Sequence, residues 1–487
     1  MMTPKDIIEP NRYDIRLDEI RLQNFRGFTS LQLNFHERLT AIIGDNGAGK
    51  STILDVISEH LRFFLQHILL DDSPKSNFKK SDIKNGTLIS NTKANFLLTY
   101  PKFEEEENEN NNQVPENEPD FFNRQITATS IIGLNINKIE KEGTSFLPNI
   151  KKELSHASKK ELSNESLDAF TAFYIDFHKS FRNDGEDSLP ILVYYGGNSI
   201  NTNFEDSTSD FLMDDRFKEI YRGSLIPGRF TFNDFFDWYN RRYKVGLITQ
   251  IQYEIDLINN AIIEVFSDTE QYFKNLRIDY HTSYEALVID KVILKDSHFE
   301  KETIDISQMS SGEKNLFALV SDLAMRLITA NPKLKGMSGV TDNNPLLQGK
   351  GIVLIDEIDL HLHPKWQSKI LPKLMDLFPK VQFIITTHSP IVLQGVNGII
   401  YRLNAGNLTK IPPLGGWKIE QILSHLGLKQ HYGKKYLELV DEFYDACKIK
   451  DIIGAENSFN MIHLLLPDES TFRIILKNRL ETLKESW

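Results

Sequence analysis

Hydrophobic and polar positions alternate in two segments near the start of the chain, residues 14–25 and 30–35, with RGFT between them. Strict alternation is typical of a half-buried strand, so this pattern predicts a β-hairpin. A mostly apolar run, LTAII, follows in residues 39–43, and a glycine-rich loop then leads into a segment with helical spacing. The order predicts a buried strand, a loop and a helix.

The pattern is mixed in residues 61–299. Acidic and asparagine residues crowd residues 103–120, where self-repulsion and the lack of apolar side chains predict a disordered loop. Strands are predicted at 125–137, 190–195 and 286–294, and helices at 167–181 and 247–266.

Two further apolar runs, residues 352–355 and 381–385, each end in polar residues, and the chain beyond 397 has helical spacing. Near its end, an apolar stripe at helical intervals must be buried against something. We expect either this protein's own head, a second copy or a partner to cover Phe472, Ile475, Leu476, Leu480 and Leu483.

Composition narrows the class of protein. The formal net charge of −12 argues against a non-specific nucleic-acid coat, which needs clustered Lys and Arg. A single cysteine, Cys447, excludes an internal disulfide and a cysteine-rich zinc site. The chain has neither a membrane-length apolar run nor a signal-peptide core, so we expect a cytoplasmic protein without membrane contact.

Residues 44–51, GDNGAGKS, match the G-x-x-x-x-G-K-[ST] phosphate loop in the required strand–loop–helix context. The glycines let successive amides face one concavity, Lys50 reaches the outer phosphates, and the Ser51 hydroxyl coordinates Mg²⁺. A chance glycine turn is the competing interpretation. The predicted ATP-binding residues are Asn46, Gly47, Ala48, Gly49, Lys50, Ser51 and Thr52.

Two acids end the apolar run of residues 352–357. At the carboxyl end of a buried parallel strand, Asp356 would hold Mg²⁺ and Glu357 would polarise the attacking water. His388 follows the next such run and could bond the γ-phosphate or that water. A solvated acidic turn and an ordinary histidine at a strand end are the alternatives.

Three other patterns are weaker. His361 and His363 form an H-x-H pair without a third ligand nearby, so a structural role is favoured over a metal site. YYGGNS at residues 194–199 carries no assignment. Ser310 and Glu313 have capping-box spacing before an apolar helix, which is a sufficient explanation for SQMSSGEKN.

Taken together and in this order, NFRGF, GDNGAGKST, MSSGEKN, LIDEIDLHLHP and TTHSP resemble the ABC-type ATPase heads related to SMC and RecF proteins. The longer string GIVLIDEIDLHLHPKWQ, followed by FPKVQFIITTHSP, resembles the PtuA ATPases of Septu and retron-associated antiphage systems. In those systems the ATPase has an HNH nuclease as its partner.

The resemblance implies an α/β fold, an ABC-type P-loop head with an antiparallel β subdomain, an α-helical insertion and a helical C-terminal region. We place the split ATPase core at residues 1–60 and 300–396, the inserted β and helical lobe at 61–299, and the helical region at 397–487.

It also implies a role for the serine- and glycine-rich segment before the apolar helix. In the family this signature loop faces the phosphate bound by another subunit, so ATP and Mg²⁺ lie between two heads in a head-to-tail dimer or higher oligomer. The corresponding residues are Ser310, Ser311, Gly312 and Glu313, where Ser311 and Glu313 depart from the usual glycine and glutamine.

Arg26 matches a family position near the nucleotide, and a glutamine on a loop leading out of the sheet should sense Mg²⁺. Gln66, Gln113 and Gln125 are candidates for this glutamine.

Three functions fit such a head. The first is a slowly hydrolysing ATPase that controls a separate HNH nuclease in phage defence and meets nucleic acid through the complex. The second is a RecF- or SMC-like DNA-maintenance ATPase, which favours a basic stripe that the charge does not suggest. The third, a nuclease of the OLD type, is rejected because no D-x-D pair follows residue 396.

Overall fold

A computed structural model gives two compact units, Met1–Lys418 and Ile419–Trp487. Each is described separately. The described residues are 14–70, 80–87, 89–101, 121–133, 188–196, 215–221, 223–226, 232–246, 252–267, 271–280, 285–295, 298–332, 334, 344–360, 362–412, 414, 416–417, 421–422, 434–463 and 471–485. The acidic stretch at 103–120 and the helix predicted at 167–181 lie outside them.

The predicted hairpin is confirmed. Strands β1 (Asp14–Phe25) and β2 (Phe28–Asn34) pair antiparallel, with Phe25 opposite Phe28. Their buried residues alternate with exposed ones, as the hydrophobic pattern requires. Strands β4 (Ile89–Pro101) and β5 (Phe121–Gly133) extend this sheet in the order β2-β1-β4-β5.

A second, six-stranded sheet forms the centre of the first unit, in the order β13-β12-β3-β11-β10-β6. Strands β3 (Leu39–Gly44), β6 (Ile191–Tyr195), β10 (Gly351–Ile355), β11 (Val381–Thr387) and β12 (Ile399–Asn404) are parallel along it, and β13 (Asn407–Ile411) pairs antiparallel at the edge. All residues of β10 and β11 are buried, as expected for parallel strands covered on both faces. The α/β fold with a parallel sheet is confirmed.

This sheet corrects two of the predicted domain boundaries. Strand β6 comes from the segment assigned to the inserted lobe, yet it pairs with β10 in the core. Strands β12 and β13 come from the region predicted to be helical, yet β12 pairs with β3. Both errors have the same cause, because short strands find their partners far away in the sequence and no local pattern records the pairing.

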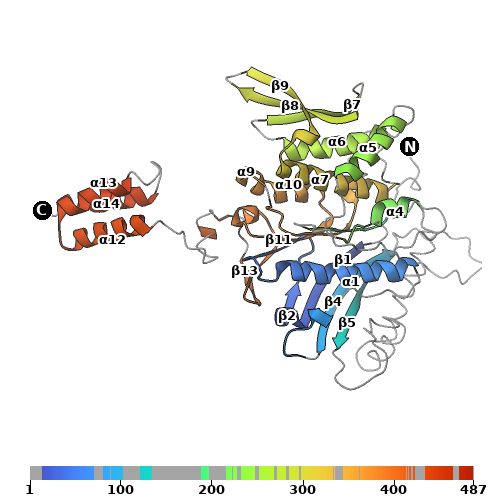
Figure 1. Cartoon of the computed structure of the whole chain (residues 1–487), viewed down its shortest axis with the longest axis horizontal. Coiled ribbons are helices and arrows are strands. Elements are labelled where there is room, and N and C mark those ends of the chain that lie inside the picture. The colour runs from blue at the N-terminus through green and yellow to red at the C-terminus, as the bar shows by residue number, and fades with distance from the viewer. Residues whose placement is uncertain are drawn as a thin grey trace, which may run out of the picture. The chain divides into compact units, whose positions relative to one another are not determined.

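Helices cover both faces of the central sheet (Figure 1). Helix α1 (Lys50–Leu70) lies on the face that also receives β1, β2, β4 and β5 (Figure 1). On the opposite face lie α7 (Ser311–Ala330), α10 (Ile370–Leu377) and α6 (Gln252–Phe266) (Figure 1). The predicted helix around 247–266 therefore forms, although it begins later than expected.

The inserted segment also supplies α4 (Asp215–Tyr221) and α5 (Phe232–Gly246). After α6, a separate three-stranded sheet forms from β7 (Gln271–Tyr280), β8 (Glu285–Lys295) and β9 (His298–Asp305), which confirms the strand predicted at 286–294. This sheet leads directly into the segment before α7. The inserted segment thus contributes both strands and helices.

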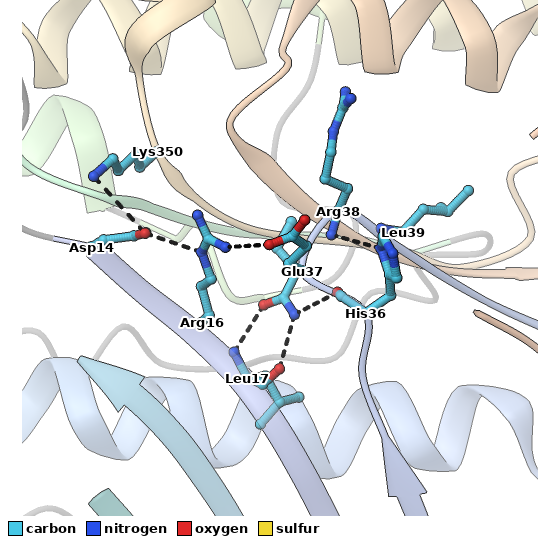
Figure 2. A network of polar contacts seen from close by, with 9 residues as sticks. Asp14, Arg16, Leu17, His36, Glu37, Arg38, Leu39 and Lys350 are labelled. Atoms are coloured by element: carbon cyan, nitrogen blue, oxygen red, sulfur yellow. Dashed lines mark hydrogen bonds and ion pairs between the residues drawn. The ribbon is translucent and has the colours of Figure 1, made fainter. Parts of the chain in front are cut away.

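A buried amide joins the two larger sheets. Gln382 of β11 accepts the backbone N–H of Leu17 at 2.8 Å and donates to its carbonyl at 2.8 Å and to that of His36 at 3.0 Å. Around it, Arg16 bonds Asp14 at 3.0 Å and Glu37 at 3.2 Å (Figure 2). A side chain that satisfies three buried backbone groups fixes the position of β1 against the central sheet.

The second unit is helical. It contains α12 (Lys434–Lys448), α13 (Ile452–His463) and α14 (Thr471–Glu485), and its core includes Phe443, Ala446, Ala455 and Ile462. Leu476, Leu480 and Leu483 of the predicted stripe are buried in this core. Ile475 is 51% exposed, so it does not belong to the buried face, and the side chain of Phe472 lies outside the described residues.

Candidate functional site

The sequence-predicted site residues meet at one edge of the central sheet. Strands β3, β11 and β10 are parallel neighbours, with Thr387 opposite Ile43 and Ile355 opposite Ile385. Their carboxyl ends therefore lie at the same edge, which is where ligands bind in open α/β sheets. The phosphate loop follows β3, the acidic pair follows β10, and His388 follows β11.

The phosphate loop needs its glycines. Gly47 and Gly49 have φ values of 76° and 103°, in the left-handed region that other residues rarely adopt. A Cβ on Gly49 would also lie 2.6 Å from the ring of Phe28, so the hairpin packs directly against the loop. Asn46 and Gly47 are exposed, and Ser51 is exposed at the first turn of α1. The amides and helix start thus remain accessible to an anion.

Lys50 is buried at the first residue of α1, with 4% of its surface exposed. Its ammonium donates to the carbonyls of Gly44 at 2.8 Å and Asp45 at 3.0 Å, and it lies 3.0 Å from Nε2 of His388. Burial lowers the pKa of this ammonium, while the nearby carboxylates of Asp356 and Glu357 act to raise it. The arrangement holds a cation at the centre of the site.

The acidic turn is organised by a threonine that sequence reasoning missed. Thr386 of β11 donates its hydroxyl to the carboxylate of Asp356, and the same oxygen accepts the backbone N–H of Glu357 at 2.8 Å. Glu357 has a φ of 51°, a strained conformation for a residue with a side chain. The hydrogen bonds to Thr386 hold this turn so that both carboxylates stand at the sheet edge.

His388 lies between the cation and the acidic pair. Its Nε2 lies 3.6 Å from Oε1 of Glu357 as well as close to Lys50. Asp359, which sequence reasoning also missed, accepts the backbone N–H of His388 at 3.1 Å and the hydroxyl of Thr387 at 2.6 Å. Asp359 therefore positions the histidine through its backbone, and only the pairing of β10 with β11 could reveal this.

Arg26 lies at the hairpin turn, with a φ of 43°. It donates to Asp82 and to Asp55 of α1, both at 2.8 Å, and its Nη1 lies 3.4 Å from Oγ1 of Thr52. Burial acts to lower the pKa of the guanidinium, but the hydrogen bonds to Asp82 and Asp55 raise it overall. The structure thus places Arg26 beside the phosphate-loop helix and shows it as a clamp between hairpin and helix.

The segment before α7 forms the predicted capping box. Ser310 Oγ accepts the backbone N–H of Glu313 at 3.3 Å, and the Glu313 carboxylate accepts the backbone N–H of Ser310 at 3.0 Å. Behind the cap, the apolar stripe is buried at Leu316, Phe317, Val320, Leu323 and Leu327. Ser310 and Ser311 are exposed, which leaves a helix N-terminus facing outward.

Other predicted residues are placed as follows. His363 begins the short helix α9 (Pro364–Gln367), where its Nδ1 accepts the backbone N–H of Lys365 at 3.3 Å, while His361 lies outside the described residues. Gln66 lies in α1 and Gln125 in β5, not on loops, so neither fits the predicted glutamine, and Gln113 lies outside the described residues.

The donor set fits ATP with Mg²⁺. Ser51 offers an accessible hydroxyl and Asp356 a carboxylate, both oxygen ligands of the kind Mg²⁺ prefers. No group of three or more His, Cys, Asp or Glu side chains that could hold a metal by themselves occurs among the described residues. The same residues contain no helix that could cross a membrane.

Comparisons with known proteins agree with this geometry. The model of a family described as "AAA domain, putative AbiEii toxin, Type IV TA system" matches residues 39–394, a span that includes the phosphate loop, the acidic turn and His388. The chain belongs to this family. The residues 310–313 also lie within the matched span, whereas Arg26 lies before it.

Individual relatives show which ATPases this chain is similar to. The retron Vc95 probable ATPase of Vibrio cholerae serotype O1 biovar El Tor is 31% identical over 427 residues, covering 79% of this chain and 73% of that protein. Septu protein PtuA of Bacillus thuringiensis is 24% identical over 474 residues, covering 95% and 96%. The resemblance to the ATPases of Septu and retron systems is therefore confirmed. A solved SMC head bound to the C-winged helix domain of ScpA aligns at 15% identity, covering 81% of this chain and 97% of that one, with a TM-score of 0.36.

Proposed function

We propose that the protein binds ATP with Mg²⁺ and slowly hydrolyses it, as the switch subunit of an antiphage complex whose nuclease activity resides in a separate HNH endonuclease. The observation that carries this proposal is the meeting of Lys50, Asp356, Glu357 and His388 at one sheet edge. These residues come from three strand ends, so their meeting is not a consequence of local sequence.

In this proposal the loop amides of residues 46–52 and the Lys50 ammonium hold the phosphates. Mg²⁺, held by Ser51 and Asp356, supplies charge neutralisation of the phosphate oxygens. The Glu357 carboxylate orients and polarises a water for attack on the γ-phosphate. His388, fixed by Asp359 through its backbone, donates a hydrogen bond toward the transferred group.

We further propose that two heads close head-to-tail around the nucleotide. Ser310, Ser311, Gly312 and Glu313 form the N-terminus of α7, whose amides favour an anion. Ser310 and Ser311 are exposed there, whereas Gly312 is buried. The γ-phosphate held by a second copy is such an anion. Ser310 already donates its hydroxyl to Glu313 at 2.7 Å, so closure would exchange this internal bond for one to phosphate.

The defence role rests on the relatives, whose names place them in retron and Septu systems. The HNH partner rests on the resemblance to PtuA ATPases, and contact with nucleic acid is assigned to the complex rather than to this chain alone. This assignment suits a chain of net charge −12, which would repel a phosphate backbone wherever basic residues are not concentrated.

The test is to express the protein with its neighbouring gene products, purify the complex and measure its mass and its ATP turnover. We expect a mass that contains at least two copies of this chain together with an endonuclease, and turnover that requires Mg²⁺ and is lost in Lys50→Ala. A monomer that neither binds nor hydrolyses ATP would contradict the ATPase proposal. A stable ATP-hydrolysing dimer without a nuclease would contradict the partner assignment alone.

A further inference from the structure

The consecutive tyrosines at the end of β6 reach the helices on opposite faces of the central sheet. Side chains alternate along a strand, so neighbours must point to opposite faces. Tyr194 donates its hydroxyl to Asp55 of α1 at 3.2 Å, and Tyr195 donates its hydroxyl to Asp322 of α7 at 2.6 Å. One strand end therefore touches both the helix that begins at the phosphate loop and the helix that begins at Ser310.

Each aspartate is also bound by an arginine, so a Tyr–Asp–Arg triad lies on each face. On the α1 face, Arg26 donates to Asp55 at 2.8 Å. On the α7 face, Arg326 donates to Asp322 at 2.8 Å and 2.9 Å. The two triads differ in burial, because the side chains of Arg26 and Asp55 are 37% and 38% exposed, whereas those of Arg326 and Asp322 are 5% and 0% exposed.

The buried triad also contacts the acidic turn through the backbone. The carbonyl of Tyr195 accepts the N–H of Asp356 at 2.7 Å, and Tyr195 pairs with Ile355 in the ladder between β6 and β10. Tyr195 is thus bonded through its hydroxyl to α7 and through its carbonyl to the residue before Glu357. Burial raises the pKa of the Tyr195 hydroxyl well above its usual range, so this group remains a donor.

The α7 side of the triad is firmly held. Arg326 also donates to the backbone carbonyl of Ile220 in α4, so its guanidinium spans two helices. Separating the buried Asp322 carboxylate from Tyr195 or Arg326 would leave buried polar groups without hydrogen-bond partners, so a shift of Asp322 carries both residues with it. The triad is therefore a stiff link rather than a loose surface contact.

A cavity of about 310 Å³ separates the two ends of this link. Its walls come from α7, including Asn315, Leu319 and Asp322, and from the acidic turn, including Asp356 and Glu357. Direct packing does not fill the space between helix and turn here. Beside this space Tyr195 bridges the two, with its carbonyl bonded to the acidic turn and its hydroxyl to α7.

We propose that Tyr195, held by Asp322 and Arg326, is a positioning residue that transmits the placement of α7 to the Asp356–Glu357 turn. This inference rests on the proposed function, since α7 begins at the residues assigned to the nucleotide of the second head. When Ser310 engages that nucleotide, a shift of α7 along its axis moves Asp322, and Tyr195 carries the shift to the backbone N–H of Asp356. ATP hydrolysis is thereby coupled to closure of the dimer.

The decisive variant is Tyr195→Phe in the full-length protein, which removes one hydroxyl and keeps the ring. Its matched control is Tyr221→Phe, because Tyr221 also has a buried hydroxyl, bonded to the carbonyl of Pro190 at the opposite end of β6. We expect Tyr195→Phe to lower kcat about tenfold or more, the scale expected for a displaced catalytic group, while KM stays near that of the wild type. Tyr221→Phe should lower thermal stability comparably and leave kcat unchanged.

Measuring dimer formation distinguishes two roles of the Tyr195 hydroxyl: transmitting the position of α7 to the acidic turn, or only stabilising α7. In a Glu357→Gln background, ATP-dependent dimerisation of Tyr195→Phe is measured by light scattering and should match that of Glu357→Gln alone. Loss of dimerisation would show that the hydroxyl only supports α7, and would overturn the inference. An unchanged kcat in Tyr195→Phe would overturn it as well. Absence of ATP hydrolysis in the wild type would instead overturn the proposed function, and the inference with it.

Discussion

Nε2 of His388 lies 3.6 Å from Oε1 of Glu357, although the two residues follow different strands of the sheet. The histidine is fixed through its backbone by Asp359, and the glutamate by the hydrogen bond from its backbone N–H to Thr386. Neither side chain owes its position to the other. They meet because β10 and β11 are paired in register, which brings a carboxylate and an imidazole to one point.

Glu357→Gln should leave ATP affinity unchanged, since the amide keeps the shape of the side chain. ATP turnover should fall by roughly 10²–10⁴-fold, because an amide cannot accept the proton of the attacking water. Steady-state phosphate release and calorimetric ATP titration measure the two effects. The exposed Glu481→Gln, on α14, is the matched control. Normal turnover in Glu357→Gln would remove this residue from the catalytic step.

Lys50→Ala should abolish ATP binding, because the buried ammonium that neutralises the outer phosphates is lost. Calorimetric titration tests this directly. Lys448→Ala removes a lysine whose side chain is 72% exposed in the second unit and should bind ATP like the wild type. If Lys50→Ala retains wild-type affinity, residues 44–51 are not the nucleotide site.

Ser310→Arg should bind ATP but fail to form the ATP-dependent dimer, since a bulky cation would occupy the helix N-terminus that faces the second head. This substitution also removes the helix cap, which typically costs about 1 kcal/mol. Ser310→Ala removes the cap without the bulk and is therefore the control for stability. Light scattering with ATP in the Glu357→Gln background gives the result, and a dimer of normal affinity would argue against the head-to-tail arrangement.

Stability should fall in mild acid because of His60. Its ring is buried in α1, with Nε2 3.1 Å from the hydroxyl of Thr92, and burial lowers its pKa from 6.5 to about 4. Between these values the unfolded chain binds a proton that the folded chain does not, so stability is lost as pH falls from 6.5 toward 4. The loss at pH 5 is about 2 kcal/mol, from ~1.36 kcal/mol per pKa unit.

Urea unfolding of the wild type and of His60→Gln at pH 7 and pH 5 measures this effect. The glutamine can still bond Thr92 but cannot titrate. The difference in unfolding free energy between pH 7 and pH 5 should therefore be smaller in His60→Gln than in the wild type, by the amount given above. An equal loss of stability in both proteins would assign the acid sensitivity to other groups.

Truncation after Gly416 should give a protein that binds ATP but does not co-purify with the endonuclease. The removed helices have a hydrophobic core of their own. They also present exposed apolar side chains, with Ile449 at 76% and Ile453 at 73% exposed. Such side chains are suited to contact with a partner.

The full-length variant Ile453→Glu is the complementary experiment, because it changes the exposed face without removing the helices. We expect it to weaken co-purification of the nuclease and to leave ATP turnover intact. If the truncated protein retains the nuclease, the docking surface lies on the first unit. Aggregation of the truncated protein would show instead that the helices cover an apolar surface of the head.

The local chemistry of the site could be predicted from the order of residues. The phosphate loop requires glycines at positive φ followed by a helix start, and these requirements lie within residues 44–51. The capping box of Ser310 and Glu313 is likewise complete within four consecutive residues. Burial of β10 followed from its continuous apolar run, and burial of β11 from the apolar residues Phe383, Ile384 and Ile385 at its centre. Short-range backbone geometry and periodicity depend on residues close together in the chain, so the sequence alone predicts them.

Pairing between distant strands decided the remaining features, which are the positions of two core strands and the residues that organise the site. Strands β6 and β12 look like any short apolar segment, and their places beside β10 and β3 depend on partners far along the chain. Thr386 and Asp359 gained their roles only because β11 pairs with β10, which brings Thr386 to the acidic turn and His388 to Asp359. Tyr195 likewise has a role only in the folded protein. It is one of two consecutive tyrosines to which the sequence assigned no function, and folding bonds it to both α7 and Asp356. Such contacts arise from register and topology, for which a single sequence carries no local signal.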